Sequence, residues 1–461
     1  MIYFVVIILI YLLHLLLKLN LWICVGLGIY SCFMIPRFRK RYRQMKNYQS
    51  RFYDVSLYLD TLLYAFVKEE KVELAVRDVR YALPEGKMKT LVETAHEYMI
   101  MTYDEVEILE ESLAMIDQEY PCKRMQDVHK FMTHVEYYGG EIEKPVGLLL
   151  ADKSRWEKRI KEEIRNRNKQ FLDVILSVVA SMIICGAILY LPIMDVDIGA
   201  NWISQIFSLV VIAVDVQIVY GALKLLAVDW IGLQLQEKEE YYLAKMQEYE
   251  AYDEEKQKTL SIFLGAIAMV AVIVFWAMGN QWITLFLLLL TLLFVNQHKV
   301  GRYLMERQLR QEIQYAFPNW LLDLVLLLQS ENVQVALEKS KEFVPGVLKK
   351  ELWQLTEQLE LEPESAKPYH EFLKGFSIPE VHSAMGILYS ISIGNSGNAD
   401  KQMGELVDKN LELLDMTERG MLKKQAAAMQ IFFLLPVLTA SFKLVVDMVV
   451  LMLTFLQMSL V

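Results

Sequence analysis

Cysteine is scarce in this sequence, and the four that occur form no recognisable pattern. Cys24, Cys32 and Cys185 lie inside apolar runs, and Cys122 stands alone in a polar stretch. Their spacing matches neither a metal site nor a disulfide framework. We therefore predict that all four behave as small buried hydrophobes.

Sequence motifs for catalysis are equally hard to find. There is no GxxxxGK[ST] phosphate loop, HExxH pair, nucleophile elbow or Cys-His cluster, and Gly394-Asn-Ser-Gly397 is interpreted as a turn between helices. His129 and His134 are five positions apart rather than the four of a helical metal pair, which predicts surface or packing roles. The paired membrane-proximal aspartates of a prepilin peptidase are not found either. We predict a protein that is not an enzyme, with no cofactor and no metal.

The net charge of −10 argues against a general polyanion binder. The basic residues cluster beside apolar blocks, which fits lipid headgroups better than nucleic acid. The lipid bilayer is therefore an expected partner, and nucleic acid is not.

Long apolar runs are the main feature that is present. A membrane span needs about 20 apolar residues, because the hydrocarbon core is roughly 30 Å thick. The candidate spans are residues 2–17, 21–36, 171–193, 203–228, 260–278, 282–297 and 428–461. The first two predict a retained hairpin rather than a signal peptide. The last is too long for one straight span, so it is either a hairpin breaking near Ser441–Lys443 or one span with an interfacial segment. Seven and eight spans both remain open.

The distribution of Lys and Arg predicts the orientation of these spans. Basic residues follow the first hairpin and the sixth span and precede the third and the last. The opposite loops, Pro192–Trp202 and Gly279–Trp282, contain none, and Lys18 alone dissents. By the positive-inside rule, all large polar segments face the cytoplasm.

An internal repeat relates the two polar regions, 37–170 and 298–427. Val72-Glu-Leu-Ala-Val76 matches Val333-Gln-Val-Ala-Leu337 at an offset of 261, and Pro84 matches Pro345 at the same offset. Pro121 and Gly147 have counterparts at slightly smaller offsets. Both copies have the same orientation, unlike the inverted repeats of many transporters.

Helical periodicity in the polar regions, with helix breaks expected at Pro84, Pro121 and Pro345, predicts an all-α integral membrane protein with two tandem cytoplasmic helical bundles. The closing helix of each bundle, 143–170 and 399–427, is expected to continue into the next span and couple bundle to membrane. The predicted divisions are a membrane hairpin (1–36), a first bundle (37–170), a span pair (171–228), a charged, solvated helical connector (229–259), a second hairpin (260–297), a second bundle (298–427) and a C-terminal membrane segment (428–461).

The stretch Phe317-Pro-Asn-Trp-Leu-Leu-Asp-Leu-Val-Leu-Leu-Leu-Gln-Ser-Glu-Asn-Val-Gln-Val-Ala-Leu337, with Ile387–Gly397 and Met403–Leu406, resembles the type II secretion system F domain. The closest likeness is to the inner-membrane platform proteins of Flp/Tad pilus assembly. It covers most of 260–461, and the first copy matches more weakly. The family has glycine at the turn after its opening helix, where this chain has Asn332 and Lys71. Because lysine tolerates the left-handed conformation poorly, the first copy's turn is expected to differ.

The resemblance implies a non-catalytic scaffold in the bacterial cytoplasmic (inner) membrane. Such platforms connect a secretion ATPase to pilin-like subunits drawn from the bilayer, and a homo-oligomer is also open. In Tad systems two separate one-domain proteins are expected to associate, so this chain would be a fusion, or an equivalent, of that pair. The acidic stretch Asp104–Glu119 is a candidate docking face for the ATPase, although a solvated helix face is the simpler and favoured explanation.

Three charges inside apolar runs are the candidate functional residues: Asp215, Lys443 and Asp447. A charge in lipid needs a partner or a wet cavity, and Lys443 and Asp447 are one helical turn apart. They would line a path for pilin helices or pair across copies, or simply snorkel or pair locally. The alternative functions are a transporter or channel using these acids and, least favoured, a membrane enzyme.

Overall fold

The computed structural model describes residues 2–101, 107–140, 142–190, 198–232, 239–250, 253–277, 281–328, 331–394 and 399–459. Throughout these ranges the regular structure is helical, with no strand. The predicted all-α class is thereby confirmed. The loops predicted at 192–202 and 279–282 and the turn at 394–397 lie partly or wholly outside the described ranges.

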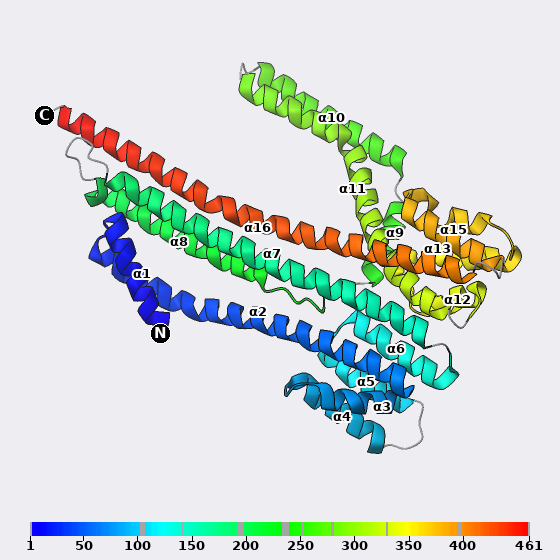
Figure 1. Ribbon diagram of the computed structural model, residues 1–461. Helices are drawn as coiled ribbons and strands as arrows, with labels where there is room; N and C mark the ends of the chain where they lie inside the picture. The colour runs from blue at the N-terminus through cyan, green and yellow to red at the C-terminus, as the bar shows by residue number, and fades with distance from the viewer. Residues whose placement is uncertain are drawn as a thin grey trace. The chain divides into compact units, whose positions relative to one another are not determined.

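The chain forms two compact units, and each is described by itself. The first comprises residues 1–130, 150–234 and 419–461, and the second comprises 131–149 and 235–418. The helices of the first unit are α1 (Ile2–Leu17), α2 (Leu21–Glu69), α3 (Val72–Ala82), α4 (Lys87–Met101), α5 (Glu107–Glu119), the first half of α6 (Lys123–Tyr138), most of α7 (Glu143–Leu189), η1 (Ile198–Ala200), α8 (Trp202–Leu226) and the later part of α16 (Ala399–Ser459) (Figure 1).

The second unit contains the second half of α6, the start of α7 and the remaining helices. These are α9 (Glu239–Glu250), α10 (Glu254–Ala277), α11 (Gln281–Leu327), α12 (Val333–Lys339), η2 (Ser340–Glu342), α13 (Gly346–Leu361), α14 (Lys367–Glu371), η3 (Lys374–Phe376), α15 (Pro379–Ser392) and α16 up to Glu418. Helices α10 and α11 form the hairpin of this unit.

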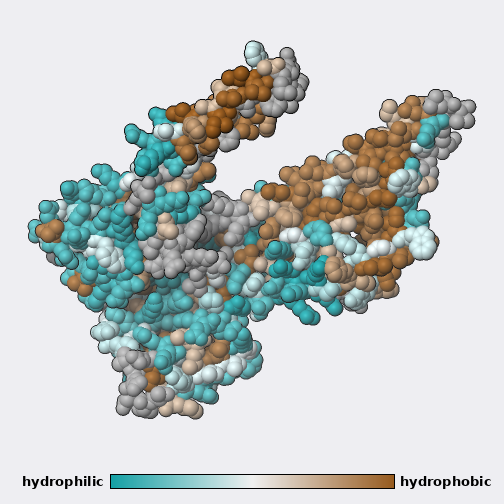
Figure 2. Space-filling view, turned by 180° about the vertical axis from the view of Figure 1, so that it is seen from behind, coloured by the Kyte–Doolittle hydropathy of each residue, from teal (hydrophilic) through white to brown (hydrophobic). Residues whose placement is uncertain are grey.

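Five helical segments among the described residues are long and apolar enough to cross a membrane. They are Leu21–Glu69, Glu143–Leu189, Trp202–Leu226, Glu255–Val274 and Ala427–Gln457, and Tyr3–Leu17 is a shorter apolar helix. Figure 2 shows apolar side chains gathered over these segments and hydrophilic side chains over the bundles. This segregation follows from the solvent each part must face, because lipid favours apolar side chains and water favours charged ones.

Four helices run without interruption from polar into apolar sequence. Helices α2, α7, α11 and α16 cross the positions 36, 170, 297 and 427 where the sequence divides membrane from bundle. The expected continuation of each bundle's closing helix into a span is therefore confirmed for α7 and α16. The composition changes at these positions, but no residue there ends the helix.

The C-terminal apolar block is one helix rather than a hairpin. Helix α16 passes through Ser441 and Lys443 with no break and contains Pro436 in its interior. The hairpin alternative is therefore wrong. Lys443, the residue expected at the turn, instead forms an ion pair with Asp447, one turn further along the same helix. The Ser441 hydroxyl likewise bonds its own helix, through the Val437 carbonyl at 2.8 Å.

Helix boundaries follow the same order in both halves of the chain. Helices α2 and α11 have 49 and 47 residues and end at Glu69 and Leu327, and each is followed by a helix beginning at a valine, Val72 or Val333. The predicted breaks at Pro84, Pro121 and Pro345 all fall between helices. This order is what duplication of a unit predicts, and the repeat remains a sequence prediction.

The first bundle is held by a buried polar and aromatic core. Phe52 meets Trp156 edge to face at 5.0 Å between ring centroids. The Tyr58 hydroxyl lies 2.9 Å from His129 Nε2, and His129 Nδ1 lies 3.1 Å from Asp117. His129 thus has the packing role that its isolation in the sequence indicated.

The second unit packs around an aromatic group at the end of α11. Phe317, Trp320 and Phe372 contact one another through their rings, and the Trp320 indole donates to Ser340 Oγ at 3.2 Å. Helix α9, in the predicted connector, packs against α11 and α13. Its Met246 is buried, and its Tyr249 ring contacts Phe376. The connector is thus helical as expected, and α9 packs one face while Gln247 and Glu248 remain exposed.

The turn after α2 differs from the family's pattern, as the lysine at position 71 predicts. The left-handed residue is Glu70 (φ 58°), and Lys71 is extended (φ −131°). Asn332 is also extended, and its side chain accepts a 3.0 Å hydrogen bond from the Val335 N–H, as a helix N-cap does. Lysine therefore avoids the conformation that it tolerates poorly.

Candidate functional site

Three apolar helices of the first unit each carry polar residues on one face. Residues four apart share a helical face, and a separation of seven brings the chain back to nearly the same side. The polar positions are Ser177, Ser181 and Cys185 on α7, Ser204, Ser208 and Asp215 on α8, and Thr439, Lys443 and Asp447 on α16. Hydrogen bonds join these faces into a buried polar cluster, defined here as Ser181, Ser204, Asp215, Thr439, Lys443 and Asp447.

Asp447 is the best satisfied acid of the polar cluster. Lys443 Nζ lies 2.5 Å from its Oδ2, and Ser204 Oγ donates to its Oδ1 at 2.7 Å. Lys443 and Asp447 are both 0 % exposed. Lys443 therefore pairs locally and does not snorkel, since no part of it reaches the surface.

Asp215 has a different environment, made of neutral hydroxyl groups. Thr439 Oγ1 donates to Oδ1 at 2.9 Å, and Ser181 Oγ donates to Oδ2 at 3.3 Å. The side chain is buried, at 1 % exposure. Asp215 thereby links all three helices, since its two partners belong to α7 and α16.

The three charges singled out in the sequence thus lie in one cluster. Asp215 and Asp447 come from the two halves of the chain, yet each bonds to the other's helix: Asp215 to Thr439, and Asp447 to Ser204. The hydroxyl donors are the residues that sequence reasoning missed. Their signal was the spacing of Ser177, Ser181 and Cys185 on α7 and of Thr439 with Lys443 on α16.

The electrostatics of the polar cluster favour a fixed structure over chemistry. A buried charge is costly unless it is paired and hydrogen-bonded, and removing one partner exposes that full cost. The cluster satisfies this need with one ion pair and three hydroxyl donors. Within the described parts of the chain, no group of three or more His, Cys, Asp or Glu side chains is placed to hold a metal ion.

Further contacts fix the helices around the polar cluster. The Gln205 side-chain amide donates to the Lys18 carbonyl at 2.6 Å, and its oxygen accepts from the Asn20 N–H at 3.0 Å. The α1–α2 turn is thus tied to α8. Helix α7 approaches α1 closely at Gly186, where an added Cβ would lie 2.9 Å from the Leu16 carbonyl oxygen. Small residues permit such approach between membrane helices.

The remaining candidate residues are distributed over the bundles and spans. Cys122 and Cys185 are buried, Cys24 is half-buried, and Cys32 is exposed, which corrects the prediction for Cys32. Its helix turns that position away from the packed side. In the acidic stretch, residues 104–106 lie outside the described ranges. Glu110 and Glu111 on α5 are exposed, whereas Asp117 bonds His129.

Comparison with known proteins adds no relative. No protein-family model matches the chain, and no curated protein or solved structure does.

Proposed function

We propose that this chain is a non-catalytic platform of the bacterial cytoplasmic membrane, coupling a cytoplasmic ATPase to the assembly of pilin-like subunits in a Tad, type IV pilus-like or type II secretion-like machine. Its large polar segments face the cytoplasm, and its apolar helices make seven crossings, because α16 is one helix rather than a hairpin. The proposal rests on the resemblance carried by Phe317–Leu337 and on the way the helices join bundle to membrane.

The observation that carries the proposal is the continuity of α7 and α16. A helix is stiff along its axis and rises about 1.5 Å per residue, so a displacement at one end reaches the other. Helix α7 has 47 residues and α16 has 61, and both pass from charged into apolar sequence. A motor that moved either bundle would therefore move a membrane helix directly.

The buried polar cluster holds the membrane part of α16 against α8. Ser204 and Asp215 on α8 bond to Asp447 and Thr439 on α16. Buried polar groups of this kind specify register, because any slip would leave charges unpaired. The membrane end of α16 is thus held against α8 while its other end belongs to the second unit.

The motor is expected to dock on charged bundle surface. Glu110 and Glu111 on α5 are exposed, and an acidic face would steer a basic partner surface toward it.

Mechanical coupling is tested at the junction of polar and apolar sequence in α7. Asn168 and Lys169 are exposed there, so their replacement leaves packing intact. Asn168→Gly with Lys169→Gly weakens the helix by roughly 1 kcal/mol per glycine relative to alanine. Asn168→Ala with Lys169→Ala is the matched control with the same loss of charge. The proposal expects the glycine pair to reduce pilus assembly at equal protein level while ATPase co-purification persists. Equal assembly in both pairs would contradict coupling through α7.

A transporter or channel is the second candidate, favoured by the burial of Asp215. Asp215→Asn keeps an acceptor for Thr439 and removes the carboxylate. If ions or pilin helices moved along a path that needs this acid, that movement would fail in the variant. The platform proposal expects pilus assembly to be unchanged at matched protein level, and loss of assembly without loss of protein would favour the acid-dependent path.

A further inference from the structure

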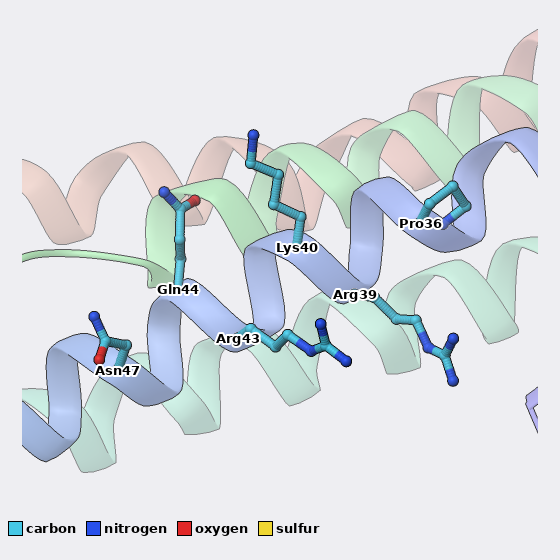
Figure 3. A pocket seen from close by; sticks show the side chains of 6 residues that line it. All are labelled: Pro36, Arg39, Lys40, Arg43, Gln44 and Asn47. Atoms are coloured by element: carbon cyan, nitrogen blue, oxygen red, sulfur yellow. The ribbon is translucent and has the colours of Figure 1, made fainter.

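The cytoplasmic end of the apolar part of α2 carries an open basic groove. It has a volume of about 530 Å³ and is lined by Pro36, Arg39, Lys40, Arg43, Gln44 and Asn47 (Figure 3). These positions recur at intervals of three and four, so they form one helical stripe. Figure 3 shows Arg39 and Arg43 extending to one side of the helix and Lys40 and Gln44 to the other.

The cations of this groove have no acidic partner among the described residues. The first 53 residues contain eight Lys or Arg and no Asp or Glu, so no carboxylate is near in sequence. Other cations of the segment are occupied. Arg37 stacks on Phe33, Arg41 bonds Gln44 and Lys46 lies over Tyr42. Arg39, Lys40 and Arg43 make no such contact, and they are the three that line the groove.

The end of the groove nearest the apolar run lies at the depth of lipid headgroups. The apolar run ends at Ile35, and at about 1.5 Å per residue Arg39 and Arg43 follow it by roughly 6 and 12 Å along the helix. The headgroup layer extends roughly 5–8 Å beyond each side of the hydrocarbon core, so Arg39 lies within it, and the Arg43 side chain extends back toward it (Figure 3). The opposite face of α2 is the packed one, with Phe38 against the Tyr220 ring at 5.4 Å. The groove thus opens away from α8.

From these observations we propose that the groove binds the phosphate of an anionic phospholipid headgroup. Arg39 and Arg43 present guanidinium groups that match phosphate oxygens in two-point hydrogen bonds, and Lys40 adds a point charge. Gln44 and Asn47 supply neutral donors for the rest of the headgroup. Basic pockets beside membrane helices bind such headgroups in other proteins. Scattered cations, by contrast, attract the protein to an anionic membrane surface without forming a binding site for one lipid.

The test is lipid retention by the full chain in mild detergent, read by native mass spectrometry. Arg39→Gln, Lys40→Gln and Arg43→Gln together remove the groove cations. Arg37→Gln, Arg41→Gln and Lys46→Gln together are the matched control, with the same charge change on the same segment. Each delipidated protein is titrated with phosphatidylglycerol, with phosphatidylcholine and with inorganic phosphate.

The proposal expects saturable binding of phosphatidylglycerol to the unmodified chain and to the control, weakened at least tenfold in the groove variant. Phosphatidylcholine should bind all three proteins weakly. Equal weakening in both variants would show diffuse attraction to the charged surface and overturn the site. Retention of inorganic phosphate without retention of phosphatidylglycerol would assign the groove to a soluble anion and overturn the lipid assignment. Matching elution profiles of the three proteins establish that all are folded.

Discussion

Ser204 on α8 donates a 2.7 Å hydrogen bond to Asp447 on α16, across 243 positions of the chain. The same carboxylate receives Lys443 on its other oxygen, and none of the three side chains is exposed by more than 1 %. An acid from the last helix is therefore satisfied jointly by its own helix and by a helix of the first half. This hydrogen bond fixes the position of α16 against α8.

Replacing one member of the buried Lys443–Asp447 ion pair should lower the stability of the protein far more than replacing both members. Lys443→Met leaves Asp447 buried without its cation, at a cost of about 3–5 kcal/mol. Lys443→Met with Asp447→Leu should cost much less, because no charge is then stranded. The measurement is thermal unfolding of the detergent-solubilised protein for both single variants and the double. Additive losses in the double variant would contradict the pairing seen in α16.

Glycine at position 186 should be needed for α7 to approach α1. A Cβ there would lie 2.7 Å from the Leu16 side chain and 2.9 Å from its carbonyl oxygen, and a backbone atom cannot simply rotate away. Gly186→Ala should destabilise the protein by about 1–3 kcal/mol. Gly26→Ala is the control in another apolar helix, with nothing within 4 Å of its Cβ, and it should be neutral or slightly stabilising. Equal melting temperatures for the two variants would argue against this close approach.

Cys122 should react slowly with thiol reagents, with a distinct pH dependence. Burial raises the pKa of its thiol from 9.0 to about 11. This rise lowers the thiolate fraction at pH 8 about 100-fold, and only the thiolate reacts. The rate of alkylation, followed peptide by peptide, should rise about tenfold per pH unit from pH 8 to 10. Glu85→Cys in a Cys122→Ser background is the exposed control, and its rate should begin to level off near pH 9. A plateau for Cys122 at that pH would mean that its thiol is open to solvent.

The sequence predicted the charged members of the polar cluster but not its hydroxyls. Asp215, Lys443 and Asp447 stand out because a charge in an apolar run is rare and costly. Serine and threonine do not, because they can bond a carbonyl of their own helix, as Ser208 does with Ser204 and Thr454 with Val450. Only packing distinguishes Ser181, whose hydroxyl instead reaches Asp215 on another helix.

Loop breaks were predicted better than helix continuity. Pro84, Pro121 and Pro345 fall between helices as expected, but Pro36, Pro318 and Pro436 lie inside long ones. A proline removes one backbone hydrogen bond, and neighbouring packing can offset that loss in a long helix. The sequence near each proline does not reveal whether such packing exists.

Glu70 occupies the left-handed position of the turn after α2, and glycine there should stabilise the first bundle. Its φ of 58° costs a residue with a Cβ about 1–2 kcal/mol, whereas glycine adopts it freely. Glu70→Gly should therefore raise stability by about 1 kcal/mol, because the Glu70 N–H that bonds the Phe66 carbonyl at 2.8 Å is kept. Glu69→Gly, one residue earlier and helical, should lower it by about 0.5–1 kcal/mol. Thermal unfolding of the two variants gives opposite shifts if Glu70 is the turn residue. A gain from glycine at Lys71 instead would place the left-handed residue where the family resemblance put it.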